Sequence, residues 1–377
     1  MEKNWRDYCL DPGIVLPGNR AVLLRGGDEA FGAMEDLILS ARRRLLLEFY
    51  AFADDAVGRR FGALLASRAA AGVEVYLIYD AVGSLLTDRD FFRGLARAGV
   101  RVGEFHPVVP WKPYWNWGRR DHRKLICADG TVALVGGFNL SERDAPKSLG
   151  GAGWKDAQAR VTGPVAAEIE RLFWESWLAC GKVPPVRSDP APAAGSAPAA
   201  VLSATGFRQE RSIRRAYRHA IDAARVRISI TNAYFLPDRI IRKCLMRAAR
   251  RGVDVRIITP GKTDHPYVRW ASWAMFPRMM RSGIRLYEWQ GEILHSKTAV
   301  IDGVWSSVGS HNLDHRSLHY NLELNINVFD GDFGAAMESL FENDLRGCRE
   351  ITRGECRARP FVHKAASSAL YLMRSWL

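Results

Sequence analysis

The chain consists of two halves that contain the same succession of segments. Residues 70–80 (AAGVEVYLIYD) resemble residues 250–260 (RRGVDVRIITP), and residues 97–105 (RAGVRVGEF) resemble residues 281–289 (RSGIRLYEW). Each segment is typical of a helix end, a glycine that closes the helix, and an apolar strand that follows. At 377 residues the chain is long enough for two domains of ordinary size. The repeat therefore predicts two similar units.

Further helix and strand patterns lie before each pair of segments. In the first half, residues 45–52 (LLLEFYAF) are typical of a buried strand, and a helical pattern precedes them. The apolar residues of that helix are Phe31, Met34, Leu37, Ile38 and Ala41. In the second half we expect a helix over about residues 208–224 and a strand within residues 227–235. This alternation predicts two α/β domains with largely parallel central sheets.

A change of composition marks the boundary between the halves. Residues 184–200 (PPVRSDPAPAAGSAPAA) are rich in proline, alanine, serine and glycine and have no periodic apolar face. Such a segment is typical of a linker. The predicted organisation is an N-terminal domain at residues 1–183, this linker, a C-terminal domain at residues 201–350, and a tail at residues 351–377.

One pattern with chemically useful side chains occurs once in each half. Residues 122–139 read HRKLICADGTVALVGGFN, and residues 295–312 read HSKTAVIDGVWSSVGSHN. Both fit H-x-K-x4-D followed by G-[GS]-x-N, with the same number of residues between the histidine and the asparagine. Since the pattern recurs at equivalent places of a separate repeat, it indicates a shared functional role.

The spacing of histidine and lysine has a direct structural meaning. Side chains two residues apart in a strand point to the same face. We therefore expect His122 with Lys124, and His295 with Lys297, to project into one cleft. A neutral imidazole is a nucleophile and its conjugate acid is a proton donor. Two facing imidazoles thus supply one attacking group and one acid, and the two ammonium groups are suited to the oxygens of a phosphate group.

The aspartates and asparagines of the pattern are expected to have different tasks. Asp129 and Asp302 each precede a glycine in a pair typical of a hairpin turn, which predicts a structural role away from the imidazoles. The return strand of each hairpin brings Asn139 or Asn312 back to the end that carries the histidine. Their amides are expected to join the lysines in binding phosphate oxygens.

A reactive imidazole also needs an acceptor that holds its second ring nitrogen. Glu323 follows His295 by 28 residues, and Asp156 follows His122 by 34 residues. Each opens an apolar alternating strand, and we expect these two carboxylates to orient the imidazoles. The alternative is that they are ordinary acids at strand ends.

The paired motifs resemble those of the phospholipase D superfamily. The phrases YDAVGS, DHRKLICADG, LHSKTAVIDG and GSHNLDHRSLHYNLELN are similar to its bacterial cardiolipin synthase branch, and the resemblance runs from about residue 20 to residue 345. It implies two α/β/α sandwich domains with mixed, largely parallel central sheets, related by a pseudo-twofold axis. One departure is Gly137, which stands where the second motif has Ser310. The first motif therefore has one hydroxyl donor fewer.

The resemblance also implies a reaction. One histidine attacks a phosphodiester and forms phosphohistidine, without a metal ion or other cofactor. The partner histidine protonates the leaving alcohol and then deprotonates the incoming one. In the family the first motif usually supplies the nucleophile, which points to His122, with His295 as acid and then base. The two motifs are nearly symmetric, so the residues alone do not decide these roles.

Three enzymatic functions use this chemistry. The favoured one is a phosphatidyltransferase that makes cardiolipin from phosphatidylglycerol or another phosphatidyl donor. A phospholipid hydrolase differs only in that water captures the intermediate. A nuclease would suit the net charge of +13. However, aromatic residues gather before one motif and do not form an open channel, so we expect a phospholipid partner and no nucleic acid.

An aromatic and basic segment, residues 111–124 (WKPYWNWGRRDHRK), supports a lipid substrate. Its rings are expected to contact the glycerol backbone and acyl chains, and its arginines the phosphate. The alternative is a packed loop with surface arginines. The residues concerned are Trp111, Tyr114, Trp115, Trp117, Arg119, Arg120 and Arg123. Trp270 and Trp273 are candidates for lipid contact or core packing, and Arg316 is a further candidate for substrate contact.

The final segment, the absence of targeting segments and the cysteines indicate where the protein is located. Residues 361–377 (FVHKAASSALYLMRSWL) have an apolar stripe typical of a helix that lies in a membrane interface or docks on the protein. We see no signal peptide and no apolar run of roughly 18 residues. The six cysteines form no CxxC pair and are expected to be reduced. These features predict a peripheral protein at the cytoplasmic face of the cell membrane.

Overall fold

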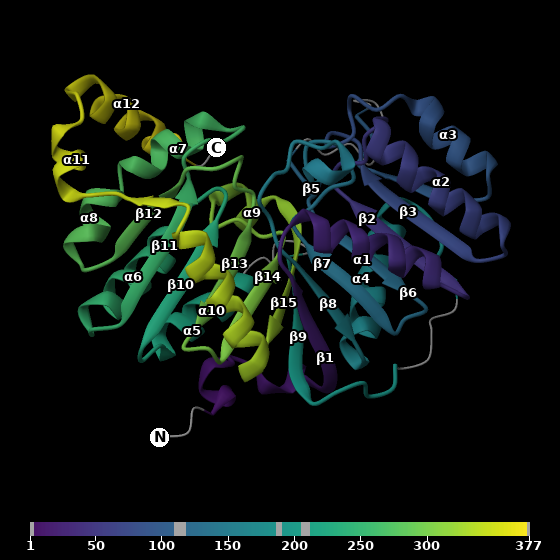
Figure 1. Cartoon of the computed structure of the whole chain (residues 1–377), viewed down its shortest axis with the longest axis horizontal. Coiled ribbons are helices and arrows are strands. Elements are labelled where there is room, and N and C mark those ends of the chain that lie inside the picture. The colour runs from purple at the N-terminus through teal and green to yellow at the C-terminus, as the bar shows by residue number, and fades with distance from the viewer. Residues whose placement is uncertain (1–3, 109–117, 186–190, 205–211, 375–377) are drawn as a thin grey trace.

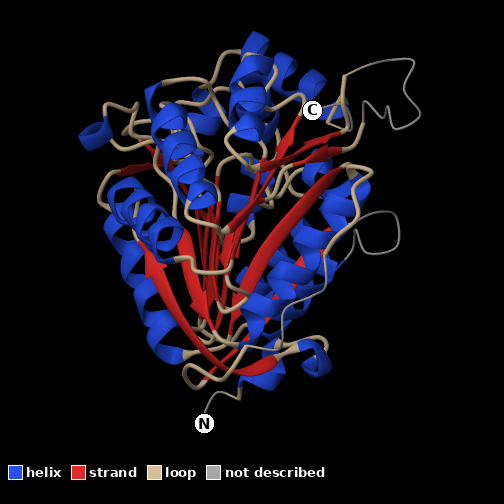
Figure 2. Cartoon of the chain, turned by 90° about the vertical axis from the view of Figure 1, so that its right-hand side faces the viewer, coloured by secondary structure: helices blue, strands red, loops and turns tan. Residues whose placement is uncertain are grey.

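The computed structural model describes residues 4–108, 118–185, 191–204 and 212–374. Within these ranges, sixteen strands join one mixed sheet, and helices pack on both of its faces (Figures 1 and 2). Among the described residues, none of the helices has the length and apolar character that crossing a bilayer requires.

The first half contains eight strands and four α-helices in its described part. Their bounds are β1 Leu16–Leu24, α1 Gly27–Ser40, β2 Arg44–Phe49, α2 Ala56–Ala70, β3 Glu74–Asp80, α3 Arg89–Arg97, β4 Arg101–Phe105, β5 Arg120–Asp121, β6 Lys124–Ala128, β7 Val132–Gly136, β8 Gln158–Thr162 and α4 Pro164–Ala179. Aspartate side chains accept hydrogen bonds from the first turns of α2 and α3, which fixes where these helices begin.

The second half repeats this succession and adds a C-terminal extension. Its elements are β9 Ala197–Ala204, α5 Ser212–Ala223, β10 Arg227–Asn232, α6 Arg239–Arg250, β11 Asp254–Pro260, α7 Pro266–Trp273, α8 Phe276–Arg281, β12 Arg285–Trp289, β13 Lys297–Ile301, β14 Trp305–Gly309, α9 His315–His319, β15 Asn321–Val328, α10 Gly331–Leu345, β16 Cys348–Glu350, α11 Arg353–Ala358 and α12 Phe361–Leu372. The helix and strand expected at about 208–224 and 227–235 correspond to α5 and β10.

The strand order shows how the halves are related. It runs β16-β12-β11-β10-β13-β14-β15-β9-β1-β8-β7-β6-β2-β3-β4, and β5 pairs with β15 outside this row. Apart from β16, the order is the same when read from either end towards the β9–β1 pair, which places a pseudo-twofold axis there. The α/β fold with a mixed sheet is thus confirmed. Among the strands of the described residues, the parallel pairs are β2–β3–β4, β10–β11–β12 and the short β5–β15 pair.

The sheet continues from one half into the other, which the sequence did not predict. Strand β9 pairs with β15 on one side and with β1 on the other. Its first residues, 197–200, belong to the segment interpreted above as a linker, so that interpretation is corrected for them. The reason is composition, since alanine and proline are poor predictors of strand. Here small alanines are buried between neighbouring strands, and the carbonyl of Pro198 accepts a hydrogen bond from the amide of Phe329.

The core is shared in the same way. Helix α4 of the first half packs against β9, and helix α10 of the second half packs against β1. One continuous cluster of buried apolar side chains includes Leu46, Leu125 and Phe173 from the first half and Val300, Leu324 and Phe333 from the second. The two halves are therefore held as one body, and the site between them has a fixed geometry.

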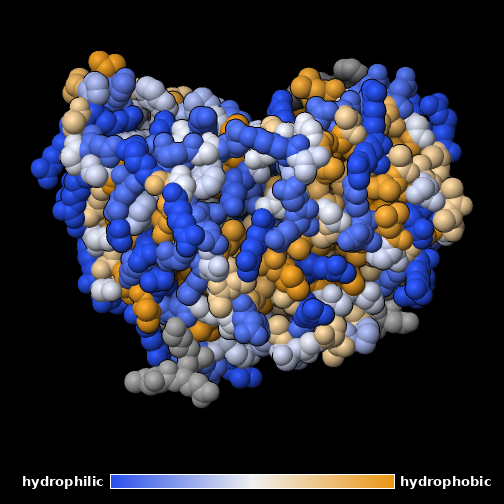
Figure 3. Space-filling model, viewed as in Figure 1, coloured by the Kyte–Doolittle hydropathy of each residue, from blue (hydrophilic) through white to orange (hydrophobic). Residues whose placement is uncertain are grey.

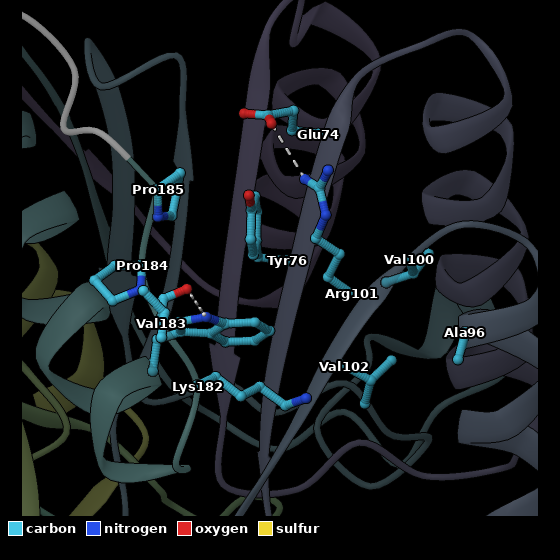
Figure 4. A pocket seen from close by; sticks show the side chains of 11 residues that line it. Glu74, Tyr76, Ala96, Val100, Arg101, Val102, Lys182, Val183, Pro184 and Pro185 are labelled. Carbon is cyan, nitrogen blue, oxygen red and sulfur yellow. Dashed lines mark hydrogen bonds and ion pairs between the residues drawn. The ribbon is translucent and has the colours of Figure 1, made fainter.

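A surface hollow of about 680 Å³ lies on the outer edge of the first half, beside β4 (Figure 4). Arg101 donates a hydrogen bond to Glu74 there, and the indole of Trp177 donates to the carbonyl of Val183. Neither histidine motif contributes a residue to its lining. The histidines of the two motifs lie instead at the junction of the halves.

Candidate active site

His122 lies between β5 and β6, and its imidazole is held by the other half of the chain. Nδ1 of His122 lies 3.0 and 3.1 Å from the two carboxylate oxygens of Glu323 in β15. The backbone amide of His122 also donates to the carbonyl of Leu322, because β5 pairs with the start of β15. Glu323 is fully buried. This contact leaves Nε2 of His122 for chemistry.

His295 is held by the reciprocal arrangement. Its Nδ1 donates to Oδ2 of Asp156 at 2.9 Å, and its backbone amide donates to the carbonyl of Lys155. Each imidazole is thus oriented by a carboxylate from the opposite half. The distances along the sequence, measured above from the histidine of the same half, did not reveal this exchange. A site built in this way exists only where the two halves meet.

The two lysines are buried beside the imidazoles. Nζ of Lys124 donates to the carbonyl of His122 at 2.6 Å, and Nζ of Lys297 donates to the carbonyl of His295. Burial, together with the nearby ammonium group of Lys297, lowers the pKa of Lys124 to about 7 against the opposing effect of Glu323. Burial also lowers the pKa of Lys297. An anion bound between the two ammonium groups would relieve both effects, as expected of a phosphate site.

The electrostatics of His122 favour its neutral form. Burial lowers the pKa of His122 to about 4, and the two lysines act in the same direction, while Glu323 opposes them. Burial would raise the pKa of Glu323, but His122 and Lys124 outweigh it and keep the pKa below its usual range. Near neutral pH the pair is therefore an imidazole that donates from Nδ1 to a carboxylate, with a lone pair on Nε2.

The one departure between the two motifs has a steric cause. Ser310 donates its hydroxyl to Oε2 of Glu323 at 2.5 Å. Its counterpart Gly137 lies directly against Asp156, and a Cβ atom there would be 2.1 Å from Oδ2 of that aspartate. The second motif therefore accommodates a serine that supports Glu323, whereas the first requires glycine so that Asp156 reaches His295.

We expect the substitution Gly137→Ser to lower activity by roughly tenfold to a hundredfold, because the new side chain displaces Asp156 and leaves His295 without its acceptor. Steady-state turnover of a phospholipid measures this effect. Gly32→Ser in α1 is the control, since nothing lies within 4 Å of a Cβ at that position. Wild-type turnover in the Gly137→Ser variant would contradict the steric argument.

The asparagines that end the motifs differ in their surroundings. Asn139 accepts a hydrogen bond from the amide of Ala51 through Oδ1 and donates through Nδ2 to Asp144. Asn312 is 2% exposed, and its Oδ1 has no hydrogen-bond partner within the described residues. Asn139 is thus fixed by the protein itself, and Asn312 retains an amide oxygen for further contacts.

The motif aspartates lie in the hairpin turns. Asp129 and Asp302 both have φ of 55°, and the glycines that follow have φ of 69°, as a turn between two antiparallel strands requires. The carboxylate of Asp129 accepts from the amides of residues 42–44, and that of Asp302 from the amides of residues 225–227. Each aspartate ties its hairpin to the start of β2 or β10.

Two arginines expected to contact the lipid phosphate lie instead in the interior. Arg120 is 3% exposed, and its guanidinium group lies 3.4 Å from the carboxylate of Asp80. Arg123 is fully buried and contacts Glu48 at 3.6 Å and the hydroxyl of Ser176 at 3.0 Å. For Arg123 the reason is strand alternation, since a residue between His122 and Lys124 points to the opposite face. These two assignments are corrected.

The other residues expected to contact lipid have different outcomes. Trp273 is buried in an apolar cluster of the second half, beneath the guanidinium of Arg359, so of its two alternatives the structure shows core packing. Trp270 is half-buried and lies 5.3 Å from the ring of His363 in α12. Arg119 is half-buried and Arg316 is exposed. Trp111, Tyr114, Trp115 and Trp117 lie outside the described residues.

Three aromatic residues beside the imidazoles were not predicted. Tyr50 lies edge-on to His122 with ring centroids 5.1 Å apart, and Tyr234 lies 6.3 Å from His295. Trp154 lies 5.4 Å from His295 on another side. Tyr50 and Tyr234 follow β2 and β10, the equivalent strands of the two halves. When residues 47–52 (LEFYAF) are aligned with residues 230–235 (ITNAYF), the two tyrosines stand one position apart, so the repeat alone does not pair them.

No group of three histidine, cysteine, aspartate or glutamate side chains is placed to hold a metal ion within the described part of the chain. The polar groups of the site are thus two imidazole–carboxylate pairs and two ammonium groups. Such a set is suited to attack on a phosphate ester, with one imidazole as nucleophile and the other as acid and base.

Comparison with known proteins assigns a context to this arrangement. A family model described as "Cardiolipin synthase, PLD-like domain" matches residues 34–177 and 217–345. Cardiolipin synthase A of Pseudomonas fluorescens strain Pf-5 is 35% identical over 344 residues, which cover 91% of this chain and 72% of that protein. Cardiolipin synthase A of Pseudomonas syringae pv. syringae is 32% identical over 93% of this chain and 73% of its own length.

The fold is also similar to that of a solved enzyme. The crystal structure of phosphatidylserine synthase from Haemophilus influenzae aligns with 98% of this chain and 96% of its own, with a TM-score of 0.74 and 14% sequence identity. At this identity the likeness concerns the fold alone.

Proposed function

The chain belongs to the phospholipase D superfamily, in the family of cardiolipin synthase PLD-like proteins, and we propose that it makes cardiolipin by transferring a phosphatidyl group between phospholipids. The observation that carries this proposal is the pair of imidazoles, each held through Nδ1 by the opposite half, with two buried lysines beside them. Similarity to cardiolipin synthases over about nine-tenths of the chain supports the substrate class.

In the first step Nε2 of His122 attacks the phosphorus of a donor such as phosphatidylglycerol. The nitrogen–phosphorus bond forms as the bond from phosphorus to the headgroup oxygen breaks, and protonated His295 gives its proton to the leaving glycerol. Lys124 and Lys297 hold the nonbridging oxygens, where negative charge is stabilised in the transition state. The low pKa of His122 supports its assignment as the nucleophile.

In the second step the neutral His295 removes the proton from a hydroxyl group of a second phosphatidylglycerol. The resulting oxygen nucleophile attacks the phosphorus, the nitrogen–phosphorus bond breaks, and His122 is regenerated. The products are one cardiolipin and one glycerol. No step requires a metal ion, because the charges that a metal would neutralise are met by two lysines.

The test is incubation of the purified protein with phosphatidylglycerol in the presence of EDTA, followed by separation of the lipids. We expect cardiolipin and glycerol. Phosphatidic acid as the main product would identify a hydrolase, and cleavage of DNA without lipid turnover would identify a nuclease. Reversible inhibition by EDTA would overturn the metal-independent mechanism.

The pH dependence of kcat/KM follows from the same groups. His122 must be neutral to attack, so activity should fall as the pH is lowered towards its pKa of about 4. Lys124 must be protonated to bind phosphate, so activity should also fall as the pH rises through its pKa of about 7. A short-chain lipid in micelles gives the profile. An activity that climbs steadily from pH 7 to about pH 9 would contradict this assignment.

We propose further that the protein works at a membrane surface as a peripheral protein. Helix α12 packs on α7 with Ser367 buried, while its apolar stripe faces outward, with Phe361 82%, Val362 72% and Leu372 76% exposed. In the first half Leu86, between β3 and α3, is 90% exposed. Figure 1 shows α12 and α3 at the same end of the molecule, and Figure 3 shows hydrophobic residues on both shoulders of this end with a depression between them.

Replacing Phe361 and Val362 together by aspartate should lower the affinity for phosphatidylglycerol vesicles, measured by sedimentation, by roughly a hundredfold, because about 3 kcal/mol of apolar burial is lost. Leu178→Asp is the control, since Leu178 is 61% exposed on α4 in the other half. Activity on detergent-dispersed lipid reports whether the fold is intact. Unchanged vesicle binding of the double variant would rule out α12 as a membrane contact.

A further inference from the structure

A row of polar side chains extends from His295 and is not used by the mechanism above. The hydroxyl of Tyr234 donates to Oδ1 of Asp264 at 2.8 Å, and Oδ2 of Asp264 lies 3.6 Å from Nε2 of His265. Nδ1 of His265 in turn lies 2.9 Å from the hydroxyl of Tyr267. The four residues come from the segments that follow β10 and β11, so the second half alone supplies them.

The row connects the buried imidazole with the surface. The ring of Tyr234 lies 6.3 Å from that of His295 and 5.1 Å from that of His265, which lies 5.4 Å from the ring of Tyr267. His295 is 5% exposed, whereas the side chain of His265 is 44% exposed and Tyr267 is 41% exposed. The row therefore leads from the buried imidazole to two side chains that are open to solvent.

The chemistry of the row differs from that of the phosphate site. Burial would raise the pKa of Asp264, but His265 and the hydrogen bond from Tyr234 outweigh it, so the group stays a carboxylate near neutral pH. A carboxylate repels a phosphate but accepts hydrogen bonds from hydroxyl groups. Imidazole and phenol groups both donate and accept. Such a set is suited to an alcohol with several hydroxyl groups.

A positive charge also acts on the row. Arg316 is exposed at the start of α9, and its charge acts on the phenols of Tyr267 and of Tyr50 in the first half. An alcohol that carries its own phosphate would thus meet the hydroxyl-binding groups of the row and a guanidinium group whose charge reaches Tyr267. Guanidinium groups are suited to bind phosphate.

We propose that Asp264, His265 and Tyr267 bind the glycerol moiety that exchanges at His295, and that Arg316 binds the phosphate of the acceptor lipid. The proposal rests on the proposed function. Because His295 serves both steps, the glycerol that leaves in the first step and the glycerol of the acceptor occupy the same place. The row then favours a polyol over water or a simple alcohol, and Arg316 favours a phospholipid over free glycerol.

The experiment measures how one phosphohistidine intermediate is divided between acceptors. Wild-type protein and variants receive phosphatidylglycerol in mixed micelles together with 1-butanol, and the ratio of cardiolipin to phosphatidylbutanol is determined. Asp264→Asn and Tyr267→Phe should each lower this ratio about tenfold, since one hydrogen bond to a charged or polar group is lost and butanol does not use it. Tyr320→Phe is the matched control, because Tyr320 is also 41% exposed and lies outside the row.

Arg316 has a separate signature in the same assay. Arg316→Ala should lower the ratio of cardiolipin to phosphatidylbutanol about tenfold but leave unchanged the ratio of deuterated phosphatidylglycerol, formed from free deuterated glycerol, to phosphatidylbutanol. A product ratio reports only molecules that have formed the intermediate, so partial misfolding does not alter it.

The outcomes distinguish the two levels of the proposal. If the wild-type protein forms no phosphatidyl-transfer product, the proposed function is wrong. If the wild-type protein makes cardiolipin and the ratios of the Asp264 and Tyr267 variants equal the wild-type ratio, the acceptor site alone is wrong. Loss of every product in these variants would also overturn it, because the row would then be needed for catalysis itself.

Discussion

The variant His122→Ala is expected to lose at least about four orders of magnitude in turnover, because it removes the imidazole assigned as the nucleophile, while His295 is engaged as acid and base. Nδ1 of His122 is held by Glu323, and Nζ of Lys124 donates to the carbonyl of His122 beside it. Removal of the imidazole leaves binding intact but takes away the covalent route. Cardiolipin formation from phosphatidylglycerol measures the loss.

The control for His122→Ala is His219→Ala, since His219 lies on α5 outside the site, with its Nε2 3.1 Å from the carbonyl oxygen of Asp7. This variant should keep wild-type turnover. Binding of vesicles by His122→Ala should also be unchanged, which separates loss of chemistry from loss of fold. Residual turnover of more than a few per cent in His122→Ala would mean that His122 is not the nucleophile.

The variant Glu323→Gln is expected to lower the rate of phosphohistidine formation by roughly three orders of magnitude, although Glu323 lies in the opposite half from His122. The two oxygens of Glu323 accept hydrogen bonds from Ser310 and Asn321 as well as from Nδ1 of His122. In Glu323→Gln one carboxylate oxygen is replaced by an NH2 group, which donates and cannot accept a hydrogen bond from these three donors. The Nδ1 proton then loses its acceptor, and the lone pair on Nε2 is no longer fixed.

The companion variant Asp156→Asn should instead impair protonation of the leaving group by His295. The two variants can be distinguished by rapid mixing with a phosphatidyl donor whose headgroup is a good leaving group. Such a headgroup leaves without a proton from His295. Asp156→Asn should then form phosphohistidine at a near-normal rate, whereas Glu323→Gln should not. Glu35→Gln, which alters a surface pair with Arg60, is the control. The opposite pattern would show that the exchange between halves does not operate.

Much of the fold follows from the sequence because the repeat is strong. The segments around residues 70–80 and 250–260 combine helix end, glycine and strand, and β3 and β11 form there. The hairpins follow from the Asp-Gly pairs, whose backbone favours a turn with positive φ. What the repeat does not contain is the relation between its two copies. The β9–β1 junction depends on alanine-rich residues with no strand pattern of their own.

In the site, too, the sequence predicts the local features but not the contacts between the halves. The spacing of His122 and Lys124 predicts which face they share, since alternation in a strand is a local property. The pairing of His122 with Glu323 is not local, because it depends on β5 lying beside β15. The assignment of Arg123 to the lipid failed for a local reason that the sequence did contain, namely its position between two residues of the opposite face.

The central claim is that an imidazole of the first half is the nucleophile of a site completed by the second half. The most direct measurement is to quench wild-type protein during turnover of phosphorus-labelled phosphatidylglycerol in alkaline denaturant, which preserves phosphohistidine, and to locate the label by peptide mapping. We expect label on His122 in the wild-type protein and far less in Glu323→Gln. Label on His295, or equal label on His122 in both proteins, would contradict it.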